Sequence, residues 1–432
     1  MKRLKLAIFL LSVAMVGLVS CSSNNSNKKS NNPTKPNEPE VVDPVDHNPR
    51  VTFTISGYSI TNIKVESSKD TIDLVIPDEI DGTAITQVSW RSFSDSSLRG
   101  KTIDKLVIGK NMRDVCFYGT EGKINDVEVS SENEIYMKSG KFLLSKDSKT
   151  FFWSPAFEIS ELPSTIENIE GYSFINYSGS SLTLPSQIKR LENNAIPQEF
   201  ATVNLNNGLE YIGFSALNVN TIIVPASVTS LEYSSFGNRL NSVFVDSGNT
   251  TYDSRNNCCM VVEKATNKVI ITSKTYSFPS TVTAIATSAF GYTYNYTNIT
   301  IPDTVTRLDL GAFRYCYNLE YLTLPSNVEI YSNSSKSNNL SYIVQGCYKL
   351  KSFNCPNTIT KLDKSSLSGL NNLEELYIPK LTTIEDDCFA NTPKLSKLYV
   401  NMTQSEWEAL NYVDTSNRLA NVEIIFNATQ LA

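Results

Sequence analysis

Short runs in which every second residue is apolar, each closed by a proline, recur along most of the chain. Six of them share one pattern, namely LVIPDEI from residue 74, LTLPSQI from 182, IIVPASV from 222, ITIPDTV from 299, LTLPSNV from 322 and LYIPKLT from 376. Such alternation is typical of a strand with one buried face. Proline stops the ladder because it has no N–H to donate. Each run therefore predicts a short strand that ends at its proline.

The spacing of these prolines reveals a repeat. Pro279, Pro302 and Pro325 lie 23 residues apart, as do Pro356 and Pro379. A fuller unit reads I-P-x-x-V-x-x-L-x-x-x-A-F-x-x-C-x-x-L-x-x-L-x-L-P. A fixed period of this length is typical of a solenoid, in which each coil buries its apolar side only against neighbouring coils. We expect the strands of successive coils to pair into a parallel sheet, with the Ala-Phe step on the opposite wall.

Two longer gaps in the repeat hold similar insertions. They read SENEIYMKSGKFLLSKDSKTFFW (131–153) and SGNTTYDSRNNCCMVVEKATNKVII (247–271). Each contains a strand pattern, a turn with Gly or Asn, and a second strand pattern, so each predicts a β-hairpin. Near the C-terminus, Thr403 and Glu406 have the spacing of a capping box at the start of a helix.

The repeat unit resembles the BspA-like class of leucine-rich repeat, which is common in bacterial and protist surface proteins. The resemblance covers nearly all of residues 74–426 and includes the opening FTISGYSITNIKVESSKDTIDLVIPDEI, N-x-x-Y-x-x-x-x-G insertions and the terminal NMTQSEWEAL. It implies a β-rich leucine-rich repeat solenoid with a parallel sheet on the concave face, hairpin inserts and few short helices. A parallel β-helix or a sandwich of similar strands is the alternative. We expect a capping hairpin at 51–73, the solenoid at 74–400 and a C-terminal cap at 401–432.

The first twenty residues have the features of an export signal. A basic start precedes an uncharged apolar run at residues 6–19, which is shorter than the roughly 20 residues that a membrane-spanning helix needs but suits a signal peptide. Leu18-Val19-Ser20-Cys21 resembles the bacterial lipobox. The resemblance implies that residues 1–20 are removed and that Cys21 carries the lipid that anchors the protein to a membrane.

Residues 21–50 predict a disordered tether. Positions 22–49 contain no aromatic residue, Leu or Ile, so this segment cannot bury enough apolar surface to fold. As a flexible chain it would reach roughly 30 Å. Loss of Lys2, Arg3 and Lys5 with the signal takes the 38 basic side chains to 35 against 44 acidic ones, a net charge of −9. This balance disfavours a nucleic-acid partner, which requires clustered cations.

The candidate reactive residues have structural explanations. Cys316 shares its repeat position with Cys347, Leu370 and Thr392, as expected of a small buried apolar residue. The single histidine, His47, lies in the predicted tether, which excludes catalytic dyads and zinc sites that need histidine. Phosphate-binding glycine motifs and calcium loops are absent from the sequence. We therefore predict no catalytic residue, no metal and no cofactor. A hydrolase using paired carboxylates such as Asp386-Asp387 stays open, although the place of this pair in the turn before the Cys-Phe step strongly favours a solvated turn.

Surface aromatic residues are the remaining candidates. The middle residue of each L-x-L strand points away from the core, and this column contains Phe244, Tyr377 and Tyr399, with Tyr321 also outward. The loop GYTYNYTN at 291–298 adds Tyr292, Tyr294 and Tyr296. Aromatic residues are common anchors of interfaces, so these seven are the predicted partner-binding residues. The alternative is ordinary cross-strand stacking.

These features predict a non-enzymatic, lipid-anchored protein of the cell envelope, with the outer membrane or cell surface as its place. The family resemblance implies protein–protein interaction or adhesion to host proteins, matrix or other cells. A glycan-binding accessory lipoprotein is the alternative, and a carboxylate-based hydrolase is a third. The stretch SSNNSNKKS after Cys21 lacks the acidic residues that often follow the lipidated cysteine of exported surface lipoproteins. A periplasm-facing anchor or the outer leaflet of a Gram-positive membrane therefore stays open.

Overall fold

The computed structural model describes residues 45–431, except positions 201, 333, 338–339, 341–342, 365 and 368. The predicted signal peptide, Cys21 and the tether as far as residue 44 lie outside the described residues. The chain divides into two compact units, one ending at Phe157 and the other beginning at Glu158. Within the described part, no helix is long and apolar enough to cross a membrane.

The first unit contains two main ladders of strands. One joins β1 (Val45–Asp46), β4 (Thr71–Val75), β8 (Thr102–Ile108), β10 (Lys123–Ile124) and β11 (Val127–Val129), all in parallel pairs. The other starts with the antiparallel hairpin of β2 (Arg50–Ser56) and β3 (Ser59–Glu66) and continues in parallel through β7 (Gln87–Val88) and β9 (Asp114–Val115). A small hairpin of β5 (Glu79–Ile80) and β6 (Thr83–Ala84) lies between β4 and β7 in the sequence.

The tether predicted for residues 21–50 extends too far toward the C-terminus. Val45 and Asp46 form β1, because pairing with the edge of β4 satisfies their backbone hydrogen bonds. His47 is held next to the same strand, with its Nδ1 2.6 Å from Oδ2 of Asp73. The folded part of the chain therefore begins no later than Val45.

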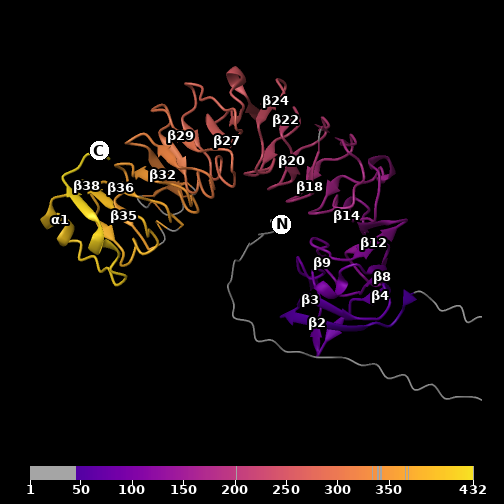
Figure 1. The fold of residues 1–432 in the computed structure, drawn as a ribbon. Coiled ribbons are helices and arrows are strands. Elements are labelled where there is room, and N and C mark those ends of the chain that lie inside the picture. Colours follow the sequence, from indigo (N-terminus) through magenta and orange to yellow (C-terminus); the bar gives the residue numbers. More distant parts are fainter. Residues whose placement is uncertain are drawn as a thin grey trace, which may run out of the picture. The chain divides into compact units, whose positions relative to one another are not determined.

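The second unit repeats two parallel ladders coil after coil (Figure 1). The predicted L-x-L strands form the first ladder: β16 (Leu182–Thr183) with β19 (Val203–Asn204), β22 (Thr221–Val224) with β24 (Ser242–Val245), and then β29 (Asn298–Thr300), β31 (Tyr321–Thr323), β34 (Ser352–Asn354), β36 (Glu375–Ile378), β38 (Lys397–Val400) and β39 (Glu423–Phe426) in one series. The chain is thus a β-solenoid of parallel strands with very little helix, which confirms the predicted fold class.

A second ladder lies at the V-x-x-L part of the repeat and was not predicted. It contains β15 (Asn168–Ile169), β17 (Arg190–Leu191), β20 (Tyr211–Ile212) and β23 (Ser230–Leu231), then β28 (Ala284–Ile285), β30 (Arg307–Asp309) and β32 (Glu329–Ser332), and finally β35 (Lys361–Leu362) with β37 (Thr383–Ile384). The apolar residues of V-x-x-L are three positions apart, which does not match the two-residue period of a strand, so only the stacking of coils reveals this ladder.

A tight turn after each proline links the two ladders. The amide of Val305 donates to the carbonyl of Pro302 at 3.0 Å, and that of Val328 donates to Pro325 at 3.2 Å. The same bond follows Pro163, Pro185, Pro225, Pro279 and Pro356. The turn directs the apolar residue into the core, where Val305 is fully buried. This geometry explains why proline and the next apolar residue are three positions apart in these seven units; after Pro379 the apolar residue, Leu381, is two positions on.

Each insertion forms three antiparallel strands, one more than the predicted hairpin. The first contains β12 (Tyr136–Ser139), β13 (Phe142–Ser145) and β14 (Thr150–Trp153), and the second contains β25 (Tyr252–Asp253), β26 (Met260–Glu263) and β27 (Lys268–Thr272). The capping box is confirmed at α1 (Gln404–Glu408), where Thr403 accepts from the amide of Glu406 and the Glu406 carboxylate accepts from the amide of Thr403 at 2.9 Å.

A buried asparagine fixes each insertion to the preceding coil. The Asn249 side-chain NH2 donates to the carbonyls of Pro225 and Val228 at 2.8 and 2.9 Å. Its Oδ1 accepts from the amides of Thr251 and Tyr252 at 2.9 and 2.8 Å. Asn133 makes the equivalent four bonds in the first insertion. One amide thus satisfies four backbone groups where the regular ladder is interrupted.

Replacing Asn249 with alanine is expected to destabilise the second unit by about 3 kcal/mol or more, because the carbonyl of Val228 and the amides of Thr251 and Tyr252 would lose their bonds to Asn249, and each buried group left unsatisfied costs about 1–3 kcal/mol. Urea unfolding followed by circular dichroism measures this as a lower midpoint. Asn298→Ala is the matched control, since Asn298 is exposed on β29. Equal midpoints for the two variants would show that the Asn249 bonds contribute little.

Candidate functional site

The cysteines of the repeat are buried within the stack. Cys316 donates from Sγ to the carbonyl of Phe290 at 3.0 Å, and Cys347 donates to the carbonyl of Phe313 at 3.2 Å, one coil further on. Burial raises the pKa of the Cys316 thiol well above its usual range. A neutral, hydrogen-bonded thiol is a poor nucleophile. This geometry agrees with the packing role predicted from the repeat position.

The carboxylate pair at 386–387 holds a neighbouring loop. Oδ1 of Asp386 accepts from the amide of Val413 at 3.0 Å. Asp387 accepts from the Thr415 hydroxyl at 2.5 Å and from the amide of Ser416 at 3.1 Å. The bond from Thr415 is the main cause that lowers the pKa of Asp387, which is unfavourable for a general acid. Among the described residues, no three His, Cys, Asp or Glu side chains are grouped as metal ligands.

Two of the predicted surface aromatic residues are buried. Tyr377 and Tyr399 are neighbours in register on β36 and β38, and their exposed fractions are only 3% and 4%. They do lie on the face away from the core, because the core cluster takes the alternate residues Leu376 and Ile378 of β36. The predicted direction of these rings is therefore right, but their predicted exposure is wrong.

The segment that follows β39 covers them. The amide of Ala428 donates to the carbonyl of Val400 at 3.1 Å, and the amide of Leu431 donates to Oδ1 of Asn354 at 3.0 Å. Asn354 is the register partner of Tyr377 on β34. The segment therefore runs from β39 back across β38 and β36 to β34. We call residues 427–431 the C-terminal strap; Figure 1 shows the chain end lying beside β36 and β38.

The other predicted residues are divided between surface and core. Tyr321 is 48% exposed, with the Lys351 Nζ 5.6 Å from its ring centroid, and Phe244 is partly exposed. Tyr296 is buried at 5%, and its hydroxyl lies 2.8 Å from that of Thr272. Burial raises the pKa of Tyr296. Its predicted place on the surface is wrong, because the loop turns inward at this residue and the ring joins the core.

Tyr292 and Tyr294 belong to a longer series of stacked and tilted rings, which we call the tyrosine ridge. The rings form a series from Phe214 to Tyr317, with centroid distances of 5.0 Å for Phe214–Tyr233, 5.7 Å for Tyr233–Tyr292, 5.1 Å for Tyr292–Tyr315 and 6.0 Å for Tyr315–Tyr317. Tyr317 also contacts Tyr294 at 4.6 Å and Tyr348 at 6.3 Å. Tyr294 and Tyr348 are 55% and 41% exposed. Rings at these separations attract one another, so the ridge is a continuous, ordered aromatic surface.

The sequence analysis missed five members of the ridge: Phe214, Tyr233, Tyr315, Tyr317 and Tyr348. The repeat contains a signal for three of the exposed rings. Tyr294, Tyr317 and Tyr348 each lie four residues after the buried residue of the Ala-Phe step, which is Phe290, Phe313 or Val344. Aligning that column, and not only the L-x-L column, would have predicted their stacking.

A left-handed backbone position orients the ridge. Tyr292 and Tyr315 both have φ of 57°, and the next coil has Gly346 at the same repeat position with φ of 74°. A Cβ on Gly346 would lie 2.2 Å from the Tyr315 ring. Glycine is therefore required at position 346, both for its backbone conformation and to leave space for the ring.

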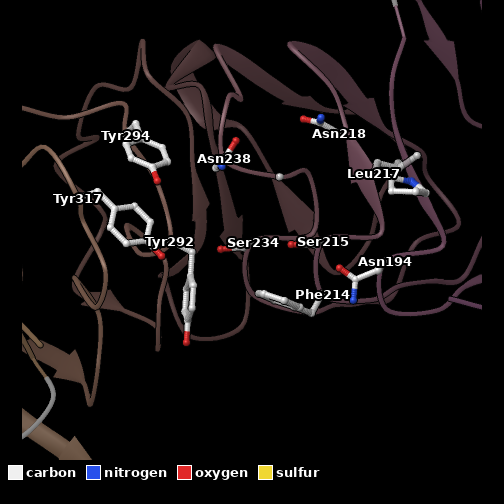
Figure 2. A pocket seen from close by; sticks show the side chains of 12 residues that line it. Asn194, Phe214, Ser215, Leu217, Asn218, Ser234, Asn238, Tyr292, Tyr294 and Tyr317 are labelled. Carbon is white, nitrogen blue, oxygen red and sulfur yellow. The ribbon is translucent and has the colours of Figure 1, made fainter. Parts of the chain in front are cut away.

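A groove of about 320 Å³ lies beside the ridge, and we call it the asparagine groove. Its lining residues come from five segments of the chain, at 194–197, 214–218, 234–238, 292–294 and 317. The first two segments include residues of β18 (Ile196–Glu199) and β21 (Leu217–Asn218), which pair in parallel. Figure 2 shows Tyr294 and Tyr317 on one side of the groove and Asn194 and Leu217 on the other. The lining contains aromatic rings, amides and hydroxyls, and it contains no charged side chain.

Removing residues 427–432 is expected to expose Tyr377 and Tyr399 without disturbing the ladder beneath them. Burial raises the pKa of Tyr377, so both exposure and phenolate formation should increase in the truncated chain. Nitration with tetranitromethane, mapped by mass spectrometry, measures this. Tyr321, exposed on β31 of the same ladder, is the internal control and should react equally in both chains. Continued protection of Tyr377 and Tyr399 after truncation would mean that the strap does not cover them.

Comparison with known proteins identifies the family. The model described as BspA type leucine rich repeat region matches in six copies, over residues 145–243, 261–345 and 330–417. No curated protein matches the sequence. Among solved structures, a leucine-rich cell surface protein of Faecalibacterium prausnitzii has a TM-score of 0.49 at 18% identity, over 84% of this chain and 96% of that one. The pneumococcal vaccine antigen PcpA has 0.47 at 16% identity, over 88% and 97%. A leucine-rich repeat protein of Eubacterium ventriosum has 0.44 at 16% identity, over 88% and 94%. Since the repeat model matches more than half of its length, the chain belongs to the BspA-type leucine-rich repeat family.

Proposed function

We propose that this protein is a non-enzymatic lipoprotein of the cell envelope that uses its solenoid to bind partner proteins in adhesion. The observation that carries the proposal is the tyrosine ridge. It offers several ordered rings on the outside of consecutive coils, two of them substantially exposed. Tyrosine gives a large contact area for a small loss of conformational entropy. The chain also belongs to the BspA-type leucine-rich repeat family, and the resemblance to this family implies protein–protein interaction or adhesion.

The ridge is suited to binding because its conformation exists before a partner arrives. Tyr317 stacks on both Tyr294 and Tyr348, so few rotamers have to be ordered on association, and that ordering is a major cost of binding. A tyrosine phenol, with an ordinary pKa of about 10, is neutral near pH 7, and burial raises the pKa of Tyr292 and of Tyr317 further. A neutral aromatic surface attracts a partner mainly by packing and hydrogen bonding.

Substituting Tyr294 and Tyr348 together with alanine should weaken binding to the partner by at least about tenfold, because central aromatic residues typically contribute more than 1 kcal/mol each. The measurement is surface plasmon resonance against immobilised matrix and host-cell proteins. Tyr58→Ala is the matched control, since Tyr58 is 62% exposed outside the ridge. Equal binding by the double variant and the control would exclude the ridge as the contact surface. A wild-type protein that binds no protein and no cell would contradict the adhesion function.

We further propose that Cys21 anchors the protein, with the chain between it and Val45 as a spacer, and that the solenoid faces the cell exterior. Cys21→Ser is expected to abolish incorporation of labelled palmitate and to move the protein from the membrane fraction to the soluble one. Protease treatment of intact cells should release fragments of the wild-type solenoid. Palmitate labelling that persists in Cys21→Ser would contradict the anchor, and full protection from protease would indicate a periplasmic orientation instead.

A further inference from the structure

The asparagine groove contains hydrogen-bonding groups that the fold leaves unused. The side-chain amides of Asn194, Asn218 and Asn238 all line it, and none of them bonds to any residue that the structure describes. Each amide offers two donors and one acceptor. Ser215 and Ser234 add hydroxyls to the same lining, and the Ser234 hydroxyl, which donates to the carbonyl of Gly291 at 3.3 Å, is left as an acceptor. The groove therefore presents a dense set of donors and acceptors close together.

The backbone places these groups in a line. Asn194, Ser215 and Ser234 occupy the same left-handed position of three successive coils, with φ of 57°, 47° and 51°. The backbone N–H of Asn194 donates to the carbonyl of Phe214 at 2.9 Å, and the backbone N–H of Ser215 donates to the carbonyl of Ser234 at 3.1 Å. Bonds between coils thus hold a conformation that non-glycine residues rarely adopt. The backbone that carries Asn194, Ser215 and Ser234 is therefore fixed by bonds between coils.

Aromatic rings complete the groove at one end. Tyr294 and Tyr317 stack with an interplanar angle of 24°, and both line the cavity together with Tyr292 and Phe214. The face of an aromatic ring carries partial negative charge, so it attracts the slightly positive C–H groups on the face of a sugar ring. The hydroxyls at the edge of the same sugar could then reach the amides.

The lack of charged side chains in the lining favours a neutral sugar over an ionic ligand. The lining has no Lys, Arg, His, Asp or Glu, so it provides no counter-ion for a phosphate, a sulfate or a carboxylate. Beyond Asn238 in the chain, Arg239 is paired with Glu199 at 3.1 Å. An apolar protein side chain would bury the three amides without partners, which is costly. A ligand rich in hydroxyls and without charge suits the groove best.

We propose that the asparagine groove binds a neutral oligosaccharide, with a sugar ring on the face of Tyr294 that Tyr317 leaves free and its hydroxyls bonded to Asn194, Asn218 and Asn238. The volume of about 320 Å³ lies at the small end of the range for ligand pockets, roughly 300–1,000 Å³, so the groove accommodates a short segment of a glycan. The inference rests on the proposed adhesive function and names the chemistry that the partner presents.

The test uses full-length protein in detergent on an array of neutral gluco-, galacto- and manno-oligosaccharides with matched sulfated and sialylated forms, followed by calorimetry on the best neutral ligand. We expect binding to neutral glycans, and a loss of at least about tenfold in affinity for Asn194→Ala combined with Asn218→Ala, because two hydrogen bonds to the ligand are removed. Asn220→Ala is the matched control, since Asn220 is exposed on the same coils but does not line the groove. Thermal melts confirm that the variants fold.

Several outcomes would overturn the proposal. These are the absence of binding to every neutral glycan, a preference for sulfated or sialylated forms, and equal affinity of the asparagine variant and the control. The failure of this inference is distinguishable from failure of the adhesive function. If Tyr294→Ala with Tyr348→Ala abolishes protein binding while the asparagine variant retains it and no glycan binds, the ridge contacts a protein and the groove is not a sugar site.

Discussion

The structure depends on the mutual burial of neighbouring coils. A single coil has too little apolar surface to form a core alone, so its valines, leucines and phenylalanine are buried only when the coils on both sides are in register. Ile285, Leu308 and Ile330 illustrate this, since they are register partners on three successive strands and all are buried. The period is therefore constrained far more strictly than the identity of the residues between the buried positions.

The same constraint turns a column of the repeat into a line on the surface. Tyr294, Tyr317 and Tyr348 stack because register places equivalent residues of adjacent coils next to one another. Charged residues follow the same rule. Lys351 pairs with Glu320 at 2.7 Å and Lys189 with Glu167 at 3.1 Å, in each case across neighbouring coils. Exposed pairs of this kind add little stability, but they neutralise one another and leave the aromatic column and the groove as the distinctive surface.

The regularity of the repeat explains which features were predictable. The L-x-L strands and the capping box at Thr403 follow from local sequence and were predicted, and the insertions were predicted as hairpins but have a third strand. The buried positions of Tyr377 and Tyr399 were not predictable in the same way. Their direction follows from strand alternation, but their burial depends on a segment some 30 to 50 residues further along the chain, where Leu431 bonds to Asn354. The prediction that Tyr296 is exposed was wrong for a related reason. The loop that carries Tyr296 departs from the repeat, and its hydroxyl forms a hydrogen bond with Thr272 of β27.

The candidate site depends on both regular and irregular parts of the sequence. The tyrosine column follows the repeat. The groove beside it is lined in part by Phe214, Ser215, Leu217 and Asn218, and these belong to a degenerate unit at residues 203–221, which has Asn206 where other units have proline. In a perfectly regular solenoid every coil packs against the next in the same way, so the surface has ridges but few hollows. Departure from the repeat is what opens a cavity, and the surrounding regular coils keep that cavity in a fixed shape. The same sequence feature that weakens the repeat pattern around residues 203–221 therefore marks the place where a small ligand has room to bind.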